Sequence, residues 1–180
     1  TSSKGLKLAS VSSFNLYSLV FNIDQTYATS KNSFIELTDV SNFLIFVLNL
    51  FIIINFFKSP QKKFNNSLVI FYLISQGSFL FMANMLERYF IPAFIPSILL
   101  MILFWQKYGW LMLFQQILWF LNLIYSYYYR SNGLINHLFR DYNFLLIRLL
   151  SLFSLLVYFL VLKIYLKPNV STLLSKSSDK

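Results

Sequence analysis

The chain has 180 residues, of which 57% are hydrophobic and 12% are charged, and its formal net charge is +9. With a mean hydropathy of +0.61, it holds more apolar surface than one soluble core of this size could bury, so the composition predicts an integral membrane protein in contact with membrane lipids. The lack of Cys and the single His predict no disulfide and no metal site, and basic residues placed between apolar runs, not in one stripe, predict no nucleic-acid partner.

Residues 1–39 are polar enough to form an external region before the first apolar run. Five runs follow that approach the roughly 20 residues an α-helix needs to cross a bilayer. They cover residues 40–57, 68–85, 89–105, 110–128 and 144–166. The sequence therefore predicts an all-α, polytopic transmembrane bundle of about five spanning helices over residues 40–166. Residues 130–143 are expected to be a loop, and residues 167–180 a cytoplasmic tail.

The distribution of Lys and Arg between the runs predicts the orientation of the bundle. One side holds Lys58, Lys62, Lys63, Lys107, Lys163, Lys167, Lys176 and Lys180. The other side holds Lys4, Lys7, Lys31, Arg88, Arg130 and Arg140, and the first three lie in the long N-terminal region, where the rule is weaker. The Lys-rich side is therefore expected to be cytoplasmic, with the N-terminal region external and the C-terminus cytoplasmic.

Glu87 and Arg88 form an acid and base pair between the second and third apolar runs. Ionisable groups at a membrane boundary are costly and often mark functional sites. Arg can hold a phosphate in a bidentate geometry that Lys does not reproduce, and Asn84 would share its helix face at i and i+4. Spacing alone favours a simpler interpretation, in which the pair caps a turn and Tyr89 belongs to an interfacial aromatic belt.

Pro92 and Pro96 lie four residues apart in the third run. Proline removes a backbone N–H and disturbs a helix interior, so this helix is expected to begin with a kink or an unwound turn.

Gln115, Trp119 and Asn122 follow i, i+4, i+7 spacing in the fourth run and share one face of the expected helix. Polar groups in such positions more often form hydrogen bonds to neighbouring helices than to ligands.

Two runs carry a family resemblance. Residues 13–17 read Ser-Phe-Asn-Leu-Tyr, and residues 79–82, Phe-Leu-Phe-Met, lead into 85–93, Met-Leu-Glu-Arg-Tyr-Phe-Ile-Pro-Ala. In this order the chain resembles the C-terminal half of GT-C fold membrane glycosyltransferases, in particular prokaryotic proteins similar to GPI mannosyltransferase 2. Those proteins typically carry Asn-Leu-Trp, then Met-His-Glu-Arg-Tyr followed by Pro-Ala. The resemblance covers about residues 12–166, and it departs at Tyr17, where the family has Trp, and at Leu86, where it has His.

The resemblance implies transfer of a hexose, expected to be mannose, from a polyprenyl-phosphate donor to an acceptor on the external or lumenal face. The lipid-linked sugar donor would take the place of a cofactor, and a bacterial or archaeal cell membrane is favoured over the endoplasmic reticulum. It also implies that Arg88 binds the donor phosphate, that Glu87 orients Arg88, and that Asn84, Tyr89 and Asn15 shape the pocket. The catalytic Asp is expected upstream of Thr1, together with further N-terminal helices that would pack against this part.

Two other classes of protein fit the same pattern. A non-enzymatic membrane subunit or scaffold would need Glu87 and Arg88 only to contact a neighbouring helix. One half of a transporter is a further alternative. The two prolines are consistent with it, but the lack of acidic residues within the apolar runs is not.

Overall fold

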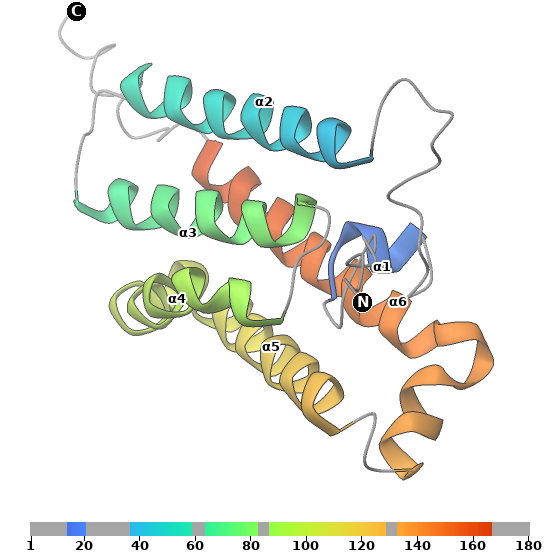
Figure 1. Ribbon diagram of the computed structural model, residues 1–180. Coiled ribbons are helices and arrows are strands. Elements are labelled where there is room, and N and C mark those ends of the chain that lie inside the picture. The colour runs from blue at the N-terminus through green and yellow to red at the C-terminus, as the bar shows by residue number, and fades with distance from the viewer. Residues whose placement is uncertain (1–13, 21–36, 59–63, 83–86, 129–132, 167–180) are drawn as a thin grey trace, which may run out of the picture.

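The computed structural model describes the backbone of residues 14–20, 37–58, 64–82, 87–128 and 133–166. These residues are almost entirely helical and contain no strand, which confirms the all-α prediction for the described part (Figure 1). The elements are α1 (Leu16–Val20), α2 (Leu37–Lys58), α3 (Phe64–Phe81), the 3₁₀-helix η1 (Glu87–Phe90), α4 (Ile91–Leu103), the π-helix η2 (Trp105–Gly109), α5 (Trp110–Tyr128) and α6 (Gly133–Leu166).

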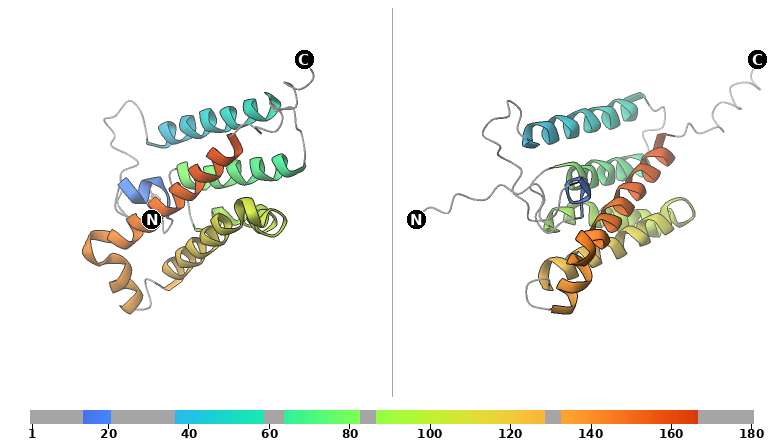
Figure 2. Two further views of the ribbon diagram at one scale, coloured as in Figure 1. Left: turned by 180° about the vertical axis from the view of Figure 1, so that it is seen from behind. Right: turned by 90° about the vertical axis from the view of Figure 1, so that its right-hand side faces the viewer.

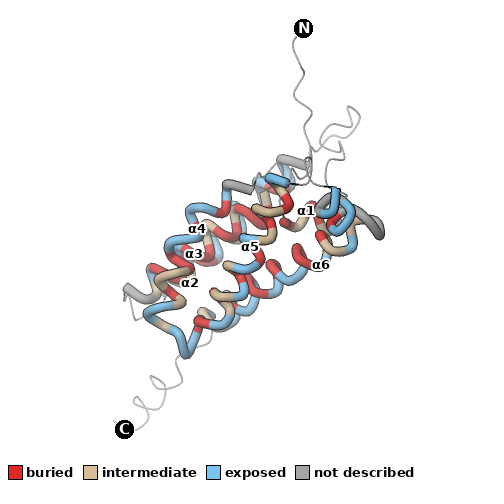
Figure 3. Tube along the Cα trace, turned by 90° about the horizontal axis from the view of Figure 1, so that it is seen from below, coloured by how far each residue is buried: buried red, intermediate tan, exposed pale blue. Residues whose placement is uncertain are grey.

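The helix α3 lies at the centre of the bundle. It packs against α2, α4 and α6, while α5 packs between α4 and α6 (Figures 1 and 2). The short helix α1 packs mainly on α6. Buried positions line the facing sides of the helices, whereas much of α2 is exposed (Figure 3). The core contains fully buried aliphatic and aromatic side chains from several helices, including Tyr72, Leu73, Leu80, Leu100 and Met112.

Among the residues that the structure describes, two helices are long and apolar enough to cross a membrane, over Asp39–Phe57 and Phe144–Leu166. The apolar stretches Asn66–Phe81 and Ile91–Leu103 are shorter. The 13 residues of α4 extend about 20 Å, which is less than the roughly 30 Å hydrocarbon core of a bilayer. The all-α part of the prediction is therefore confirmed, and the arrangement of about five spans stays a prediction.

The apolar runs predict most helix positions within a few residues. The fifth helix, α5, covers the predicted 110–128, while α3 begins and ends four residues earlier than the predicted 68–85. The third run is divided, because Phe104 leaves the helical conformation (φ −132°, ψ 44°) and the π-helix η2 follows it. The helix α4 therefore ends two residues before the predicted end of this run, and η2 begins at the last residue of the run, Trp105.

The predicted loop at 130–143 is wrong, since α6 is helical from Gly133. Its ribbon turns in this region, where Phe144 has a positive φ of 61° (Figure 1). This mostly polar segment nevertheless makes an apolar contact, because Phe139 is buried and its ring centroid lies 5.2 Å from that of Tyr125. This contact is long-range, so the local composition did not reveal it.

The expected irregular start of the third helix is confirmed. The 3₁₀-helix η1 precedes α4, and Pro92 occupies the first turn, where a missing N–H leaves no intrahelical bond unmade. Pro96 lies inside α4 and is buried.

Candidate functional site

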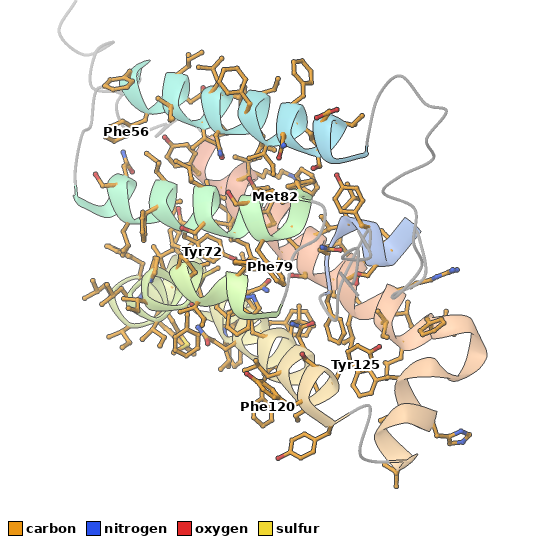
Figure 4. All side chains as sticks on the ribbon, viewed as in Figure 1. Phe56, Tyr72, Phe79, Met82, Phe120 and Tyr125 are labelled. Atoms are coloured by element: carbon orange, nitrogen blue, oxygen red, sulfur yellow. The ribbon has the colours of Figure 1, made fainter. Side chains whose placement is uncertain are left out.

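The two sequence runs that carry the family resemblance meet at one end of the bundle. The Tyr17 hydroxyl donates a hydrogen bond to the Phe81 carbonyl oxygen at 3.0 Å, which joins α1 to the last turn of α3. Figure 4 shows Phe79 and Met82 at this end of α3, which faces α1. The first run thus contacts the first part of the second run.

The helix α5 contacts both of these runs. The backbone N–H of Phe14 donates to Asn122 Oδ1 at 2.9 Å. One turn earlier on α5, the Trp119 ring stacks on Phe90 of η1, with ring centroids 5.0 Å apart and an angle of 12° between the planes. The first run, η1 and the middle of α5 therefore form a single contact region, which we call the α1–η1 site.

Asn15 begins α1 as its N-terminal cap. Its side-chain oxygen Oδ1 accepts hydrogen bonds from the backbone N–H groups of Tyr17 at 3.1 Å and Ser18 at 3.0 Å. This is the usual reason for Asn at a helix start, because the first N–H groups have no intrahelical acceptor. The hydroxyls of Ser18 and Ser151 share a hydrogen bond at 2.7 Å, which fixes α1 on α6.

Tyr17 connects three helices through its hydroxyl group. Burial raises the pKa of Tyr17, and a hydrogen bond with the Ser41 side chain of α2 partly opposes this shift. The neutral phenol therefore persists well above neutral pH and keeps its proton for the Phe81 carbonyl. That carbonyl is one of the last in α3 and has no N–H donor from its own helix.

Replacing Tyr17 with Phe is expected to lower the free energy of unfolding by about 1–2 kcal/mol, because the buried Phe81 carbonyl would lose its donor. Thermal unfolding of the protein in a mild detergent would measure this. Tyr127→Phe is the matched control, since that side chain is 69% exposed and should change stability by less than about 0.5 kcal/mol. Equal effects of the two substitutions would contradict a role of the Tyr17 hydrogen bond.

Three buried N–H groups at the α1–η1 site lack an acceptor among the described residues: Asn15 Nδ2, Asn122 Nδ2 and Trp119 Nε1. Buried donors without acceptors are costly, so native structures rarely leave them unpaired. All three are donors, so each of them would be satisfied only by an acceptor atom.

The predicted site residues have different positions in the structure. Asn15 is fully buried, as described above. Tyr89 lies in η1 and is 45% exposed. The backbone of Glu87 and Arg88 also belongs to η1, but their side chains lie outside the described part of the structure, and Asn84 lies wholly outside the described residues. The structure therefore places Asn15 at the start of α1, next to Phe14, which bonds to Asn122 of α5, while the placement of the Arg88 side chain stays a prediction.

Sequence reasoning expected Gln115, Trp119 and Asn122 to bond to neighbouring helices, and Gln115 and Asn122 do bond to other elements, whereas Trp119 Nε1 has no hydrogen-bond partner among the described residues. Gln115 Nε2 donates to Ser154 Oγ of α6 at 3.0 Å, and Asn122 accepts from Phe14. It missed Ser18 and Ser151, because single Ser residues in apolar helices are common and gave no signal. Among the described residues, no three His, Asp or Glu side chains are grouped closely enough to hold a metal ion.

Comparisons of this chain with protein-family models, curated proteins and solved structures found no match.

Proposed function

We propose that this chain forms part of a membrane glycosyltransferase that moves a hexose, specifically mannose, from a polyprenyl-phosphate donor to an acceptor on the external face. The observation that carries the proposal is the contact of residues 14–17 with the described residues of the run at 79–93, through Tyr17 and Phe81 and across α5. These are the segments on which the family resemblance rests, and they are distant in sequence.

The proposal places about five helices in a bacterial or archaeal cell membrane. The two long apolar helices support membrane insertion. The shorter helices α3 and α4 would cross only with help from neighbouring helices or a thinner bilayer. The α1–η1 site would then lie at the external face, and the C-terminus in the cytoplasm.

In this proposal the donor phosphate binds at the turn formed by η1. Arg88 would hold two phosphate oxygens and stabilise the charge that the phosphate gains as the sugar leaves. Glu87 would orient the guanidinium group, while Asn84 and Tyr89 line the pocket. The N–H groups of Asn15, Asn122 and Trp119, which have no acceptor within the described part of the chain, would complete the binding of acceptor oxygens. The catalytic Asp and its proton transfer are assigned to a segment that precedes Thr1.

Replacing Arg88 with Lys is expected to weaken binding of a polyprenyl phosphate at least about tenfold, because the bidentate contact is lost while the charge remains. We would measure this with a polyprenyl-phosphate mannose titrated into the protein in nanodiscs. Binding is the better readout, since turnover is expected to need the upstream Asp.

Arg130→Lys serves as the matched control, because it is the same change in a residue predicted to lie on the same face. Binding that is unchanged in Arg88→Lys would remove Arg88 from the site. No binding by the unchanged protein would reject the glycosyltransferase itself and leave the membrane-subunit alternative. The apolar face of α2 favours that alternative, since Phe43, Phe46 and Phe57 are each at least 65% exposed and could contact another subunit.

A further inference from the structure

A second polar cluster lies in the middle of the bundle, away from the α1–η1 site. Ser151, Ser154 and Tyr158 are buried at i, i+3, i+7 spacing and form a stripe on the inner face of α6. Ser151 bonds to Ser18 of α1, whereas Ser154 faces α3 and α5 and Tyr158 faces α3. Ser154 lies near the centre of the apolar stretch Phe144–Leu166. Polar groups at this depth are costly unless their hydrogen bonds are satisfied.

The hydroxyl of Ser154 connects two amide side chains. Gln115 Nε2 of α5 donates to Ser154 Oγ at 3.0 Å, and Gln76 Nε2 of α3 donates to the same oxygen at 3.4 Å. Ser154 in turn donates to Gln115 Oε1 at 3.4 Å. The carbonyl oxygen of Gln76 is buried and has no hydrogen-bond partner among the described residues.

Two tyrosine hydroxyls lie next to this triad. Tyr72 precedes Gln76 by one turn of α3, and Tyr158 follows Ser154 by one turn of α6, so both pairs lie on facing helices. Both tyrosines are 0% exposed. Neither hydroxyl has a hydrogen-bond partner among the described residues.

The unpaired atoms are therefore two hydroxyl groups and one amide oxygen. A metal cation would bind the oxygens but leave both hydroxyl protons unsatisfied, and an anion would be repelled by the amide oxygen. A small neutral molecule that donates and accepts satisfies all three groups. Water does so with two to four partners, and buried waters commonly occupy such positions in proteins.

We propose that the hydroxyls of Tyr72 and Tyr158 and the Gln76 carbonyl bind ordered water between α3 and α6. The water accepts from the tyrosine hydroxyls and donates to Gln76 Oε1. This inference is independent of the glycosyltransferase proposal, because it involves other side chains and no substrate. In this arrangement, bound water links polar side chains of α3 and α6 within an otherwise apolar bundle.

Radiolytic footprinting in ¹⁸O-labelled water tests the site, because hydroxyl radicals formed from bound water oxidise the side chains beside it. In the unchanged protein, Tyr72 and Tyr158 are expected to be labelled at least about threefold faster than Phe79, a buried aromatic residue of α3 without a polar group. Labelling of both tyrosines at the Phe79 rate would overturn the proposal.

A variant pair adds a second readout. Tyr158→Phe keeps the ring but removes one water ligand, so labelling of Tyr72 is expected to fall at least about twofold. Tyr127→Phe removes an exposed hydroxyl and should leave Tyr72 unchanged. Unchanged Tyr72 labelling in a folded Tyr158→Phe protein would contradict the shared site. Should that variant not fold, the comparison with Phe79 in the unchanged protein still decides.

Discussion

Replacing Gly77 with Val is expected to lower the free energy of unfolding by about 3 kcal/mol. A Cβ atom at Gly77 would lie 2.9 Å from the Tyr158 hydroxyl oxygen and 3.2 Å from Leu48 Cδ2. The first distance is shorter than real Cβ contacts allow, and Tyr158 is fully buried, so its ring has little room to move. Val adds two methyl groups beyond this Cβ and would force α2, α3 and α6 apart.

Gly133 provides the matched control, because a Cβ there has no atom within 4 Å. Gly133→Val should change stability by less than about 1 kcal/mol. Gly77→Ala should fall between the two Val variants, at about 1–2 kcal/mol, since the better helix propensity of Ala offsets part of the overlap. Denaturant titration of each variant in the same detergent gives the comparison. Similar stabilities of the Gly77→Val and Gly133→Val proteins would show that the helices do not pack closely at Gly77.

The helices were predictable because each apolar run is long and is interrupted by charged or turn-forming residues. The fourth run shows this best, since its limits at Trp110 and Tyr128 agree with α5. The pattern failed where a contact across the bundle decides the structure. Residues up to 143 were expected to be a loop because they are polar, yet Phe139 packs on Phe14 and Tyr125 and the segment is helical from Gly133.

The candidate site was predictable only in part for the same reason. Helical spacing identified Gln115 and Asn122 as residues that bond to neighbouring elements, because that pattern is local. The hydrogen bond between Tyr17 and Phe81 joins residues 64 positions apart, and no local sequence pattern predicts it. The sequence suggested Asn15 through a family resemblance, whereas the structure gives it a physical task as the N-terminal cap of α1.

Replacing Trp119 with Ala is expected to have the largest effect on stability, about 4 kcal/mol. Trp119 is 2% exposed and its ring stacks on Phe90, so truncation would leave a cavity under η1. Trp119→Phe keeps an aromatic ring against Phe90 and should cost only about 1–2 kcal/mol. The two variants therefore separate the packing of the indole ring from its hydrogen-bond donor.

The donor matters because Trp119 Nε1 is one of three N–H groups of the α1–η1 site that find no acceptor among the residues the structure describes. If Nε1 binds a phosphate or sugar oxygen, Trp119→Phe weakens binding of polyprenyl-phosphate mannose about tenfold while the protein stays folded, as expected for loss of a hydrogen bond to a charged acceptor. Trp110→Phe is the control, since Trp110 is 71% exposed and its ring contacts only Trp105 among the ring contacts of the described residues. Both binding constants can be measured in nanodiscs with the same titration. If Trp119→Phe binds as tightly as Trp110→Phe, Nε1 does not contact the donor lipid and Trp119 serves only to support η1.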